Sequence, residues 1–249
     1  MTKTFMLALI ALLFAGTGTA AERTSRFEVE TGLLNTLNME IRGFQQPNAT
    51  EGWKKSAPAL RLEYWLVKPD SWDYGIVYQP LSLSYAGDIS GDLDAKGKHF
   101  RKGSPATLNY QFPTLRFTGN FPILKAKDGD YIRLGASLLI RYARVELRTS
   151  NLGLNDANLI VLPIPNIELR KTLGHGWSVL SRADFLPAIN GSTLLDGLFD
   201  VFAGVRRDLK AGAGLDLGIR LFFGGYDPAK RDDYANRIFF NSVVVRYSW

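Results

Sequence analysis

The sequence predicts an all-β protein, folded as one antiparallel transmembrane β-barrel of about ten strands. Segments of roughly ten residues alternate apolar and polar side chains along most of the chain, and beyond the N-terminus no apolar run is long enough for a membrane-spanning helix. The connections between these segments are alternately short and long. Only helices and closed barrels satisfy all backbone polar groups inside lipid, so the pattern favours a barrel. Eight or twelve strands remain open, because long segments such as the first and fourth could be divided or merged.

The first five segments each place apolar residues on one face. In the fifth, Leu134, Leu138 and Tyr142 lie on the apolar face, while Arg133 and Arg141 lie opposite. The five segments span residues 26–44, 57–67, 72–86, 104–124 and 131–148.

Three positions interrupt this alternation. Residues 35–38 are a possible irregularity in the first segment, and the apolar face slips by one residue at Pro80 and again at Pro113. Proline within a strand usually marks a bulge or an edge. We therefore expect the strand to change register there, so that the apolar side chains before and after each proline continue one face. They are Tyr74, Ile76, Tyr78, Leu81, Leu83 and Tyr85 around Pro80, and Leu108, Tyr110, Phe112, Leu115 and Phe117 around Pro113.

The last five segments repeat the scheme. In the ninth, Leu215, Leu217 and Ile219 lie opposite Asp216 and Arg220. The five segments span residues 158–171, 177–186, 199–206, 215–223 and 237–249.

The connections give an independent test of the strand count. The short ones span residues 68–71, 125–130, 172–176 and 207–212, and the mostly longer ones span residues 45–56, 87–103, 149–157, 187–193 and 225–235. Short periplasmic turns and long extracellular loops alternate in this way in membrane barrels. An even number of strands then leaves both chain ends in the periplasm.

The N-terminus has the layout of a secretory signal peptide. Lys3 supplies a positive charge, residues 5–14 are apolar, and residues 18–21 are small, as a cleavage site requires. We expect residues 1–21 to be removed and residues 22–249 to form a single barrel domain. The chain has no cysteine, which excludes disulfides and a thiol nucleophile.

The C-terminal segment has one apolar face that ends in an aromatic carboxylate. This face comprises Phe239, Val243, Val245, Tyr247 and Trp249. The segment resembles the closing strand of Gram-negative outer-membrane β-barrel proteins, and the resemblance is to that class only. It implies an outer-membrane location and recognition of the terminal aromatic residue by the assembly machinery.

A soluble β-sandwich or lipocalin-like barrel would also alternate, with its apolar face turned inward. The placement of aromatic residues favours the membrane barrel, since most lie toward segment ends, where interfacial girdles form. These residues are Tyr64, Tyr74, Tyr78, Tyr110, Tyr142, Trp177, Tyr247 and Trp249.

If the apolar faces meet lipid, charged side chains of both signs face the lumen. They are Arg61, Glu63, Arg116, Arg133, Arg141, Glu168, Arg170, Arg182, Asp184, Asp200, Asp216, Arg220 and Arg246. A barrel of about eight to ten strands has room inside only for side chains or a small ligand. We interpret these residues as a salt-bridged core that fills the lumen. The alternative is a narrow, arginine-biased channel for small anions.

Basic residues gather in the predicted extracellular loops: Lys54, Lys55, Lys98, Arg101, Lys102, Lys230 and Arg231. Lipopolysaccharide phosphates lie at that surface and would bind them, although loop solubility alone also explains them. The formal charge of +6 is spread over the whole chain, which excludes nucleic acid as a partner and leaves anionic lipid. The oligomeric state stays open.

No catalytic, cofactor-binding or metal-binding motif is present. The two histidines are His175, in a short turn, and His99, in the longest predicted loop beside Asp88, Asp92 and Asp94. The Asp spacing does not match an EF-hand. Barrel enzymes resembling omptins or lipid A deacylases need a dyad that includes histidine. The sequence therefore predicts a non-enzymatic envelope protein, with a lipid- or peptide-modifying barrel enzyme as a distant alternative.

Overall fold

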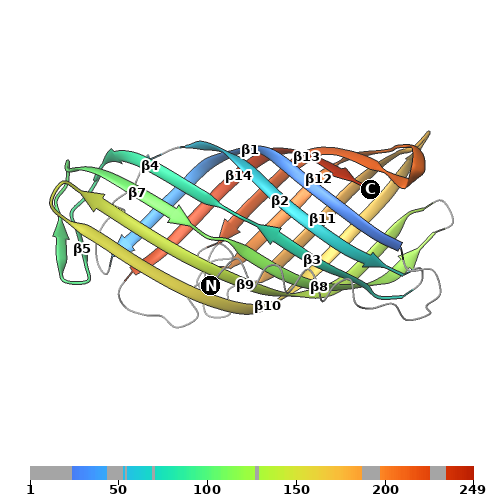
Figure 1. Cartoon of the computed structure of the whole chain (residues 1–249), viewed down its shortest axis with the longest axis horizontal. Coiled ribbons are helices and arrows are strands. Elements are labelled where there is room, and N and C mark those ends of the chain that lie inside the picture. The colour runs from blue at the N-terminus through green and yellow to red at the C-terminus, as the bar shows by residue number, and fades with distance from the viewer. Residues whose placement is uncertain are drawn as a thin grey trace.

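The computed structural model describes residues 24–43, 53, 55–68, 71–126, 129–186, 197–224 and 234–249, and most of them lie in long antiparallel strands (Figure 1). The wall strands are β1 (Thr24–Gly43), β2 (Ser56–Val67), β3 (Asp73–Gln79), β4 (Ser82–Asp88), β7 (Pro105–Gln111), β8 (Thr114–Lys125), β9 (Tyr131–Thr149), β10 (Gly153–Gly174), β11 (Trp177–Leu186), β12 (Leu198–Asp208), β13 (Gly214–Gly224) and β14 (Tyr234–Ser248). A small hairpin, β5 (Leu93–Ala95) and β6 (Lys98–Phe100), lies between β4 and β7, and a 3-10 turn (Lys210–Gly212) joins β12 to β13.

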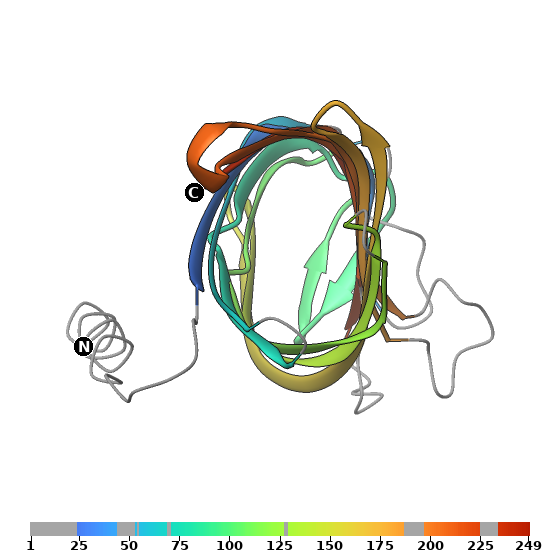
Figure 2. The same ribbon diagram turned by 90° about the vertical axis from the view of Figure 1, so that its right-hand side faces the viewer.

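The sheet closes on itself. Each strand pairs with the next around the ring, β1 pairs with β14, and β9 pairs with both β8 and β10. β3 and β4 form one wall strand interrupted near Pro80, and β7 and β8 form another interrupted near Pro113. The ring therefore has ten wall strands, which confirms the predicted fold class (Figure 2). Among the residues that the structure describes, no helix is long and apolar enough to cross a membrane.

One end of the barrel carries the start of β1, the end of β14 and the tight turns, and we name it the turn end. The opposite end, which carries the β5–β6 hairpin, is the loop end (Figure 1). The irregularity predicted for residues 35–38 is present as a register shift between Thr36 and Asn38.

The predicted long connection over residues 149–157 is wrong. β10 already begins at Gly153, and Asn155 and Asp156 pair with Glu146 and Val145 of β9. The apolar side chain of Leu154 explains this extension, because it is fully buried against the inside of the barrel. The β5–β6 hairpin was also not predicted. Its turn places Lys96 and Gly97 at positive φ values of 51° and 71°, as two-residue hairpin loops require.

The predicted register changes at Pro80 and Pro113 are also wrong. The alternation between inward and outward side chains continues unbroken through both breaks: Val77 and Gln79 face inward before Pro80, and Leu81 and Leu83 face inward after it. The apolar residues therefore move from the outer face to the inner face. The inner group comprises Leu81, Leu83, Tyr85, Leu108, Tyr110 and Phe112, all buried.

This reversal divides the barrel into two zones. Toward the turn end the outer face is apolar, as at Leu138 and Leu217, and we call this zone the apolar belt. Beyond it, toward the loop end, exposed Ser82 and Ser84 face outward and apolar side chains fill the inside. The loop-end part of the wall thus has the polarity of a water-soluble barrel, with polar side chains outside and apolar side chains inside.

Aromatic side chains border the belt at the turn end. Phe27 contacts Tyr64 with ring centroids 4.6 Å apart and Trp249 at 5.8 Å, and Trp72 contacts Phe121 at 5.7 Å. Tyr110, assigned from the sequence to an interfacial girdle, is instead buried inside against Phe112.

Candidate functional site

The lumen within the belt is filled by arginines and carboxylates, which we call the charged layer. Of the thirteen residues predicted to face the lumen, eleven are buried: Arg61, Glu63, Arg116, Arg141, Glu168, Arg182, Asp184, Asp200, Asp216, Arg220 and Arg246. The other two, Arg133 and Arg170, lie near the turn end with side chains 16% and 23% exposed.

Asp200 of β12 is the main acceptor at the centre of this layer. Its two oxygens accept hydrogen bonds from Arg61 Nη1 at 2.9 Å, from Arg220 Nη1 at 2.6 Å and from Arg116 Nη2. These arginines come from β2, β13 and β8. One carboxylate therefore links four strands across the lumen, two of which, β2 and β8, are distant from β12 around the ring.

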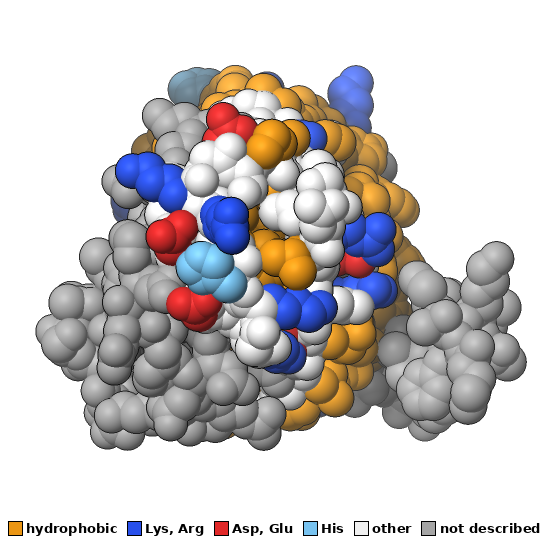
Figure 3. Space-filling view, turned by 90° about the vertical axis from the view of Figure 1, so that its left-hand side faces the viewer, with side chains coloured by type: hydrophobic (Ala, Val, Ile, Leu, Met, Phe, Trp, Pro, Cys, Tyr) orange, Lys and Arg blue, Asp and Glu red, His pale blue; other side chains and the backbone are white. Residues whose placement is uncertain are grey.

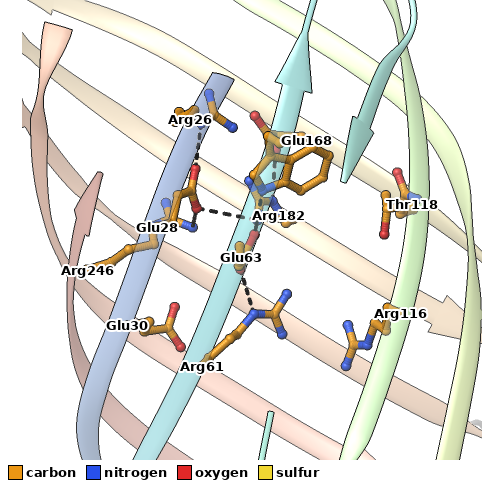
Figure 4. Close-up of polar contacts among 12 residues, drawn as sticks. Arg26, Glu28, Glu30, Arg61, Glu63, Arg116, Thr118, Glu168, Arg182 and Arg246 are labelled. Atoms are coloured by element: carbon orange, nitrogen blue, oxygen red, sulfur yellow. Dashed lines mark hydrogen bonds and ion pairs between the residues drawn. The ribbon is translucent and has the colours of Figure 1, made fainter. Parts of the chain in front are cut away.

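Arg182 of β11 forms a second centre. It donates to Glu63 of β2 at 2.6 Å and to Glu168 of β10 at 2.8 Å, while its guanidinium lies 5.0 Å from the Trp65 ring. Trp65 in turn donates to Glu63 at 2.8 Å. Figure 4 shows this cluster with side chains from β1, β2 and β8 pointing into the lumen. Each charge is held by several partners, as buried ions require.

Sequence reasoning missed five members of the charged layer. They are Arg26, Glu28, Glu30, Asp73 and Arg206, and each pairs with a residue of opposite charge. The signal was available for Glu28 and Glu30, because they alternate with Phe27 and Val29 in the first segment.

Two small cavities lie in this layer. One cavity, lined by Glu30, Arg61, Gln79, Arg220 and Phe222 among others, has a volume of about 10 Å³. Another, at the turn end beside Arg26, Glu168 and Arg206, has about 30 Å³. A single water needs roughly 10–15 Å³. Neither space therefore has the size of a solute path.

Beyond the charged layer, an apolar cluster fills the loop end, and we name it the loop-end cluster. The β5–β6 hairpin folds across the mouth there (Figure 2) and contributes side chains to it. Its members include Leu34, Trp53, Leu81, Leu83, Tyr85, Ile89, Leu93, Phe100, Leu108, Phe112, Leu147, Leu154, Phe222 and Phe240. The Trp53 indole donates to the carbonyl of Asp88 at 2.9 Å, which fixes the start of the hairpin segment.

Basic side chains lie on the surface of the loop end (Figure 3). Lys55, Lys98, Arg101 and Lys102 are exposed there, and Lys98 donates to the carbonyl of Gly153. Lys54, Lys230 and Arg231 lie outside the described residues.

His99 of β6 lies beside a carboxylate of β5. Its Nδ1 lies 2.6 Å from Asp94 Oδ1, and both side chains are more than half exposed. Asp92 accepts the backbone N–H of Lys102 at 2.7 Å. Within the described part of the chain, no group of three or more His, Cys, Asp or Glu residues could hold a metal ion.

The closing strand completes the ring at the turn end. The backbones of Trp249 and Phe27 exchange two hydrogen bonds of 3.0 Å. Of the residues that form the predicted assembly signal, Val243, Val245, Tyr247 and Trp249 are exposed on the outer face and Phe239 is half-buried.

Comparison with known proteins gives structural likenesses alone. No family model matches the chain, and no curated protein matches its sequence. Among solved structures, it is similar to the translocator domain of the autotransporter NalP from Neisseria meningitidis, with 11% identity and a TM-score of 0.45 over 98% of this chain and 95% of that one.

Two further structures are comparable. The attachment invasion locus protein Ail of Yersinia pestis has 10% identity and a TM-score of 0.38, over 90% of this chain and 99% of that one. The outer membrane protein OprG from Pseudomonas aeruginosa has 10% identity and a TM-score of 0.35, over 92% and 98%. The barrel assignment rests on the closed ring of strands itself. At the level of class, the chain resembles the Gram-negative outer-membrane β-barrels.

Proposed function

We propose that this protein is an integral outer-membrane β-barrel with a closed lumen and a structural, non-enzymatic role in the envelope. The observation that carries the proposal is the charged layer, in which Asp200 and Arg182 join strands across the lumen. The loop-end cluster and the hairpin close the mouth above it. The apolar belt supports insertion into lipid, since its exposed side chains would otherwise face water.

The charged layer suits a mechanical role better than transport. The buried guanidiniums around Asp200 and at Arg182 have lost most of their water, and their carboxylate contacts offset that desolvation. A passing solute would have to displace these contacts. The layer instead ties opposite walls together, and this supports the oval cross-section seen in Figure 2.

Planar-bilayer conductance of the purified protein tests the proposal. We expect no discrete current steps with the wild-type protein, because cavities of about 10 and 30 Å³ in the charged layer hold only about one to three waters each. The matched control is Asp200→Ala, which removes the central acceptor and should leak more readily. Regular anion-selective steps from the wild type would instead establish the alternative, a narrow anion channel.

Membrane orientation is tested by labelling single cysteines in a chain that has none. A cysteine at Gly97, in the hairpin turn of the loop end, should react with an impermeant maleimide on intact cells. One at Gly174, in a tight turn of the turn end, should react only after permeabilisation. The reverse pattern would refute the proposed orientation, and a protein that is monodisperse without detergent would refute membrane insertion.

We further propose that the basic side chains of the loop end bind lipopolysaccharide phosphates. Lys55, Arg101 and Lys102 are exposed there. Replacing all three with glutamine should reduce the lipopolysaccharide that copurifies with the folded protein, whereas replacing Lys68 at the turn end should not. Mass analysis of lipopolysaccharide incubated with the protein tests the distant enzymatic alternative, for which we expect no change in mass.

A further inference from the structure

One buried arginine of the lumen differs from its neighbours. Arg141 lies on the inner face of β9, where the charged layer meets the loop-end cluster, and is only 6% exposed. Its guanidinium lies 5.2 Å from the centroid of the Phe112 ring and 5.1 Å from that of Phe222. The Arg141 side chain reaches across the lumen to Gly224 of β13, a strand with which β9 does not pair. Its Nη1 lies 3.4 Å from the position that a Cβ atom at residue 224 would occupy.

This guanidinium has free donors. Arg141 Nε and Nη2 are both buried and find no hydrogen-bond partner among the residues that the structure describes. Arg116 Nε and Arg246 Nη1 and Nη2 also have no hydrogen-bond partner, but their guanidiniums are paired with carboxylates through other contacts. Arg61, Arg182, Arg206 and Arg220 have carboxylate partners as well, so Arg141 is set apart by having none among the ion pairs of the described residues. Contact with two aromatic rings offsets only part of the free energy lost when a cation is buried away from water.

The two free atoms are the two donors on one edge of the guanidinium. That edge is the one on which arginine binds a carboxylate through two parallel hydrogen bonds. A monatomic anion such as chloride is a single acceptor atom and cannot form two parallel hydrogen bonds with this edge. The Phe112 and Phe222 rings border the guanidinium, so an anion of single charge that neutralises the arginine fits better than a doubly charged phosphate.

We propose that Arg141 binds a small monocarboxylate anion, of the size of formate or acetate, between the charged layer and the loop-end cluster. The carboxylate accepts from Nε and Nη2, and its carbon end lies among the apolar side chains of the cluster. The site holds an anion inside a closed barrel and requires no conduction through it.

The test compares wild-type protein, Arg141→Met and Arg141→Lys, each refolded in the same detergent. Urea unfolding is followed by tryptophan fluorescence in increasing sodium acetate, with sodium chloride added to hold ionic strength constant. We expect the wild-type midpoint to rise with acetate and to saturate. Arg141→Met should show no acetate dependence and, without acetate, should be at least as stable as the wild type. Arg141→Lys keeps the charge but lacks the two-donor edge, and should respond less than the wild type.

Direct binding provides a second readout. Line broadening of ¹³C-labelled acetate in NMR should appear with the wild type and be absent with Arg141→Met. An equal acetate response in the wild type and Arg141→Met would overturn the proposal, as would a wild-type response to chloride equal to the response to acetate. If Arg141→Met fails to fold, the comparison of acetate with chloride in the wild type and Arg141→Lys still decides the question.

Discussion

The sharpest prediction concerns Asp200, because one carboxylate accepts from three arginines. Asp200→Asn keeps the shape of the side chain but removes its charge. The new NH₂ group is a hydrogen-bond donor and would face the N–H donors of the arginines. Breaking a buried ion pair by neutralising one partner costs about 3–5 kcal/mol. Asp200 is 1% exposed, so solvent screens little of this effect.

The remaining contacts set the expected size within that range. Arg61 still has Glu63, and Arg220 still has Glu30, to which it donates twice at 2.7 Å. Because these arginines keep one carboxylate each, we expect a loss near the lower limit, about 3 kcal/mol.

The matched control lies on the same strand. Asp208 also accepts from two arginines, Arg170 at 2.6 Å and Arg206 at 3.0 Å, but its side chain is 40% exposed. Exposed pairs contribute about 0–1 kcal/mol, so Asp208→Asn should have little effect. The assay is urea unfolding of both variants and the wild type, refolded into identical lipid vesicles. Equal small losses for the two variants would refute the idea that the charged layer holds the barrel together.

Three further predictions test the belt, the closing strand and a turn. Leu217→Arg, on the exposed face of β13, should cost about 2–4 kcal/mol in the same vesicle assay if that face meets lipid near the midplane; a neutral result would reverse the faces. Trp249→Asp should lower the yield of heat-modifiable folded protein in the outer membrane, and wild-type yield would exclude a role for the terminal aromatic residue. At the turn end, hydrogen bonds from the Lys171 ammonium and the Thr172 N–H lower the pKa of Asp130. A carboxyl group with a lowered pKa stabilises the fold fully above its ordinary pKa, and this stabilisation is lost as pH falls through the folded-state pKa. Hydrogen exchange should therefore show that protection of the Thr172 amide falls in acid. In Asp130→Asn the protection should not depend on pH.

Alternation predicted most of the wall strands and, except across Pro80 and Pro113, which side chains share a face. It could not say which face is inside, because an apolar face toward lipid and an apolar face toward a core have the same period. Leu83 shows the difficulty. After Pro80 the apolar residues move to the other position of the alternation, which looks like a change of register in the sequence. In the structure the backbone alternation continues, and the apolar side chains change from the outer to the inner face. The slip at Pro113 has the same origin.

The pairing of charges across the lumen was also beyond reach of the sequence. Arg61 and Asp200 are separated by 139 positions, and their contact depends on the shape of the ring and the relative stagger of its strands. Glu28 and Glu30 could have been assigned from their alternation with Phe27 and Val29. The sequence places Arg141 in the lumen, but it does not show which carboxylates come within reach. That Arg141 has no hydrogen-bond partner for Nε and Nη2 is visible only from the positions of the neighbouring side chains in the structure.

The inward and outward alternation of side chains continues through Pro80 and Pro113, and this affects what sets the height of the apolar belt. The side chains keep the same inward and outward alternation on both sides of Pro80, so the limit of the apolar belt is set by which of two neighbouring side chains is apolar. Exchanging one such pair, for example making position 82 leucine and position 81 serine, would move that boundary outward by one step of the strand without altering backbone pairing. The height of the apolar belt is therefore a property that this chain could change by point substitutions, with its backbone pairing left as it is.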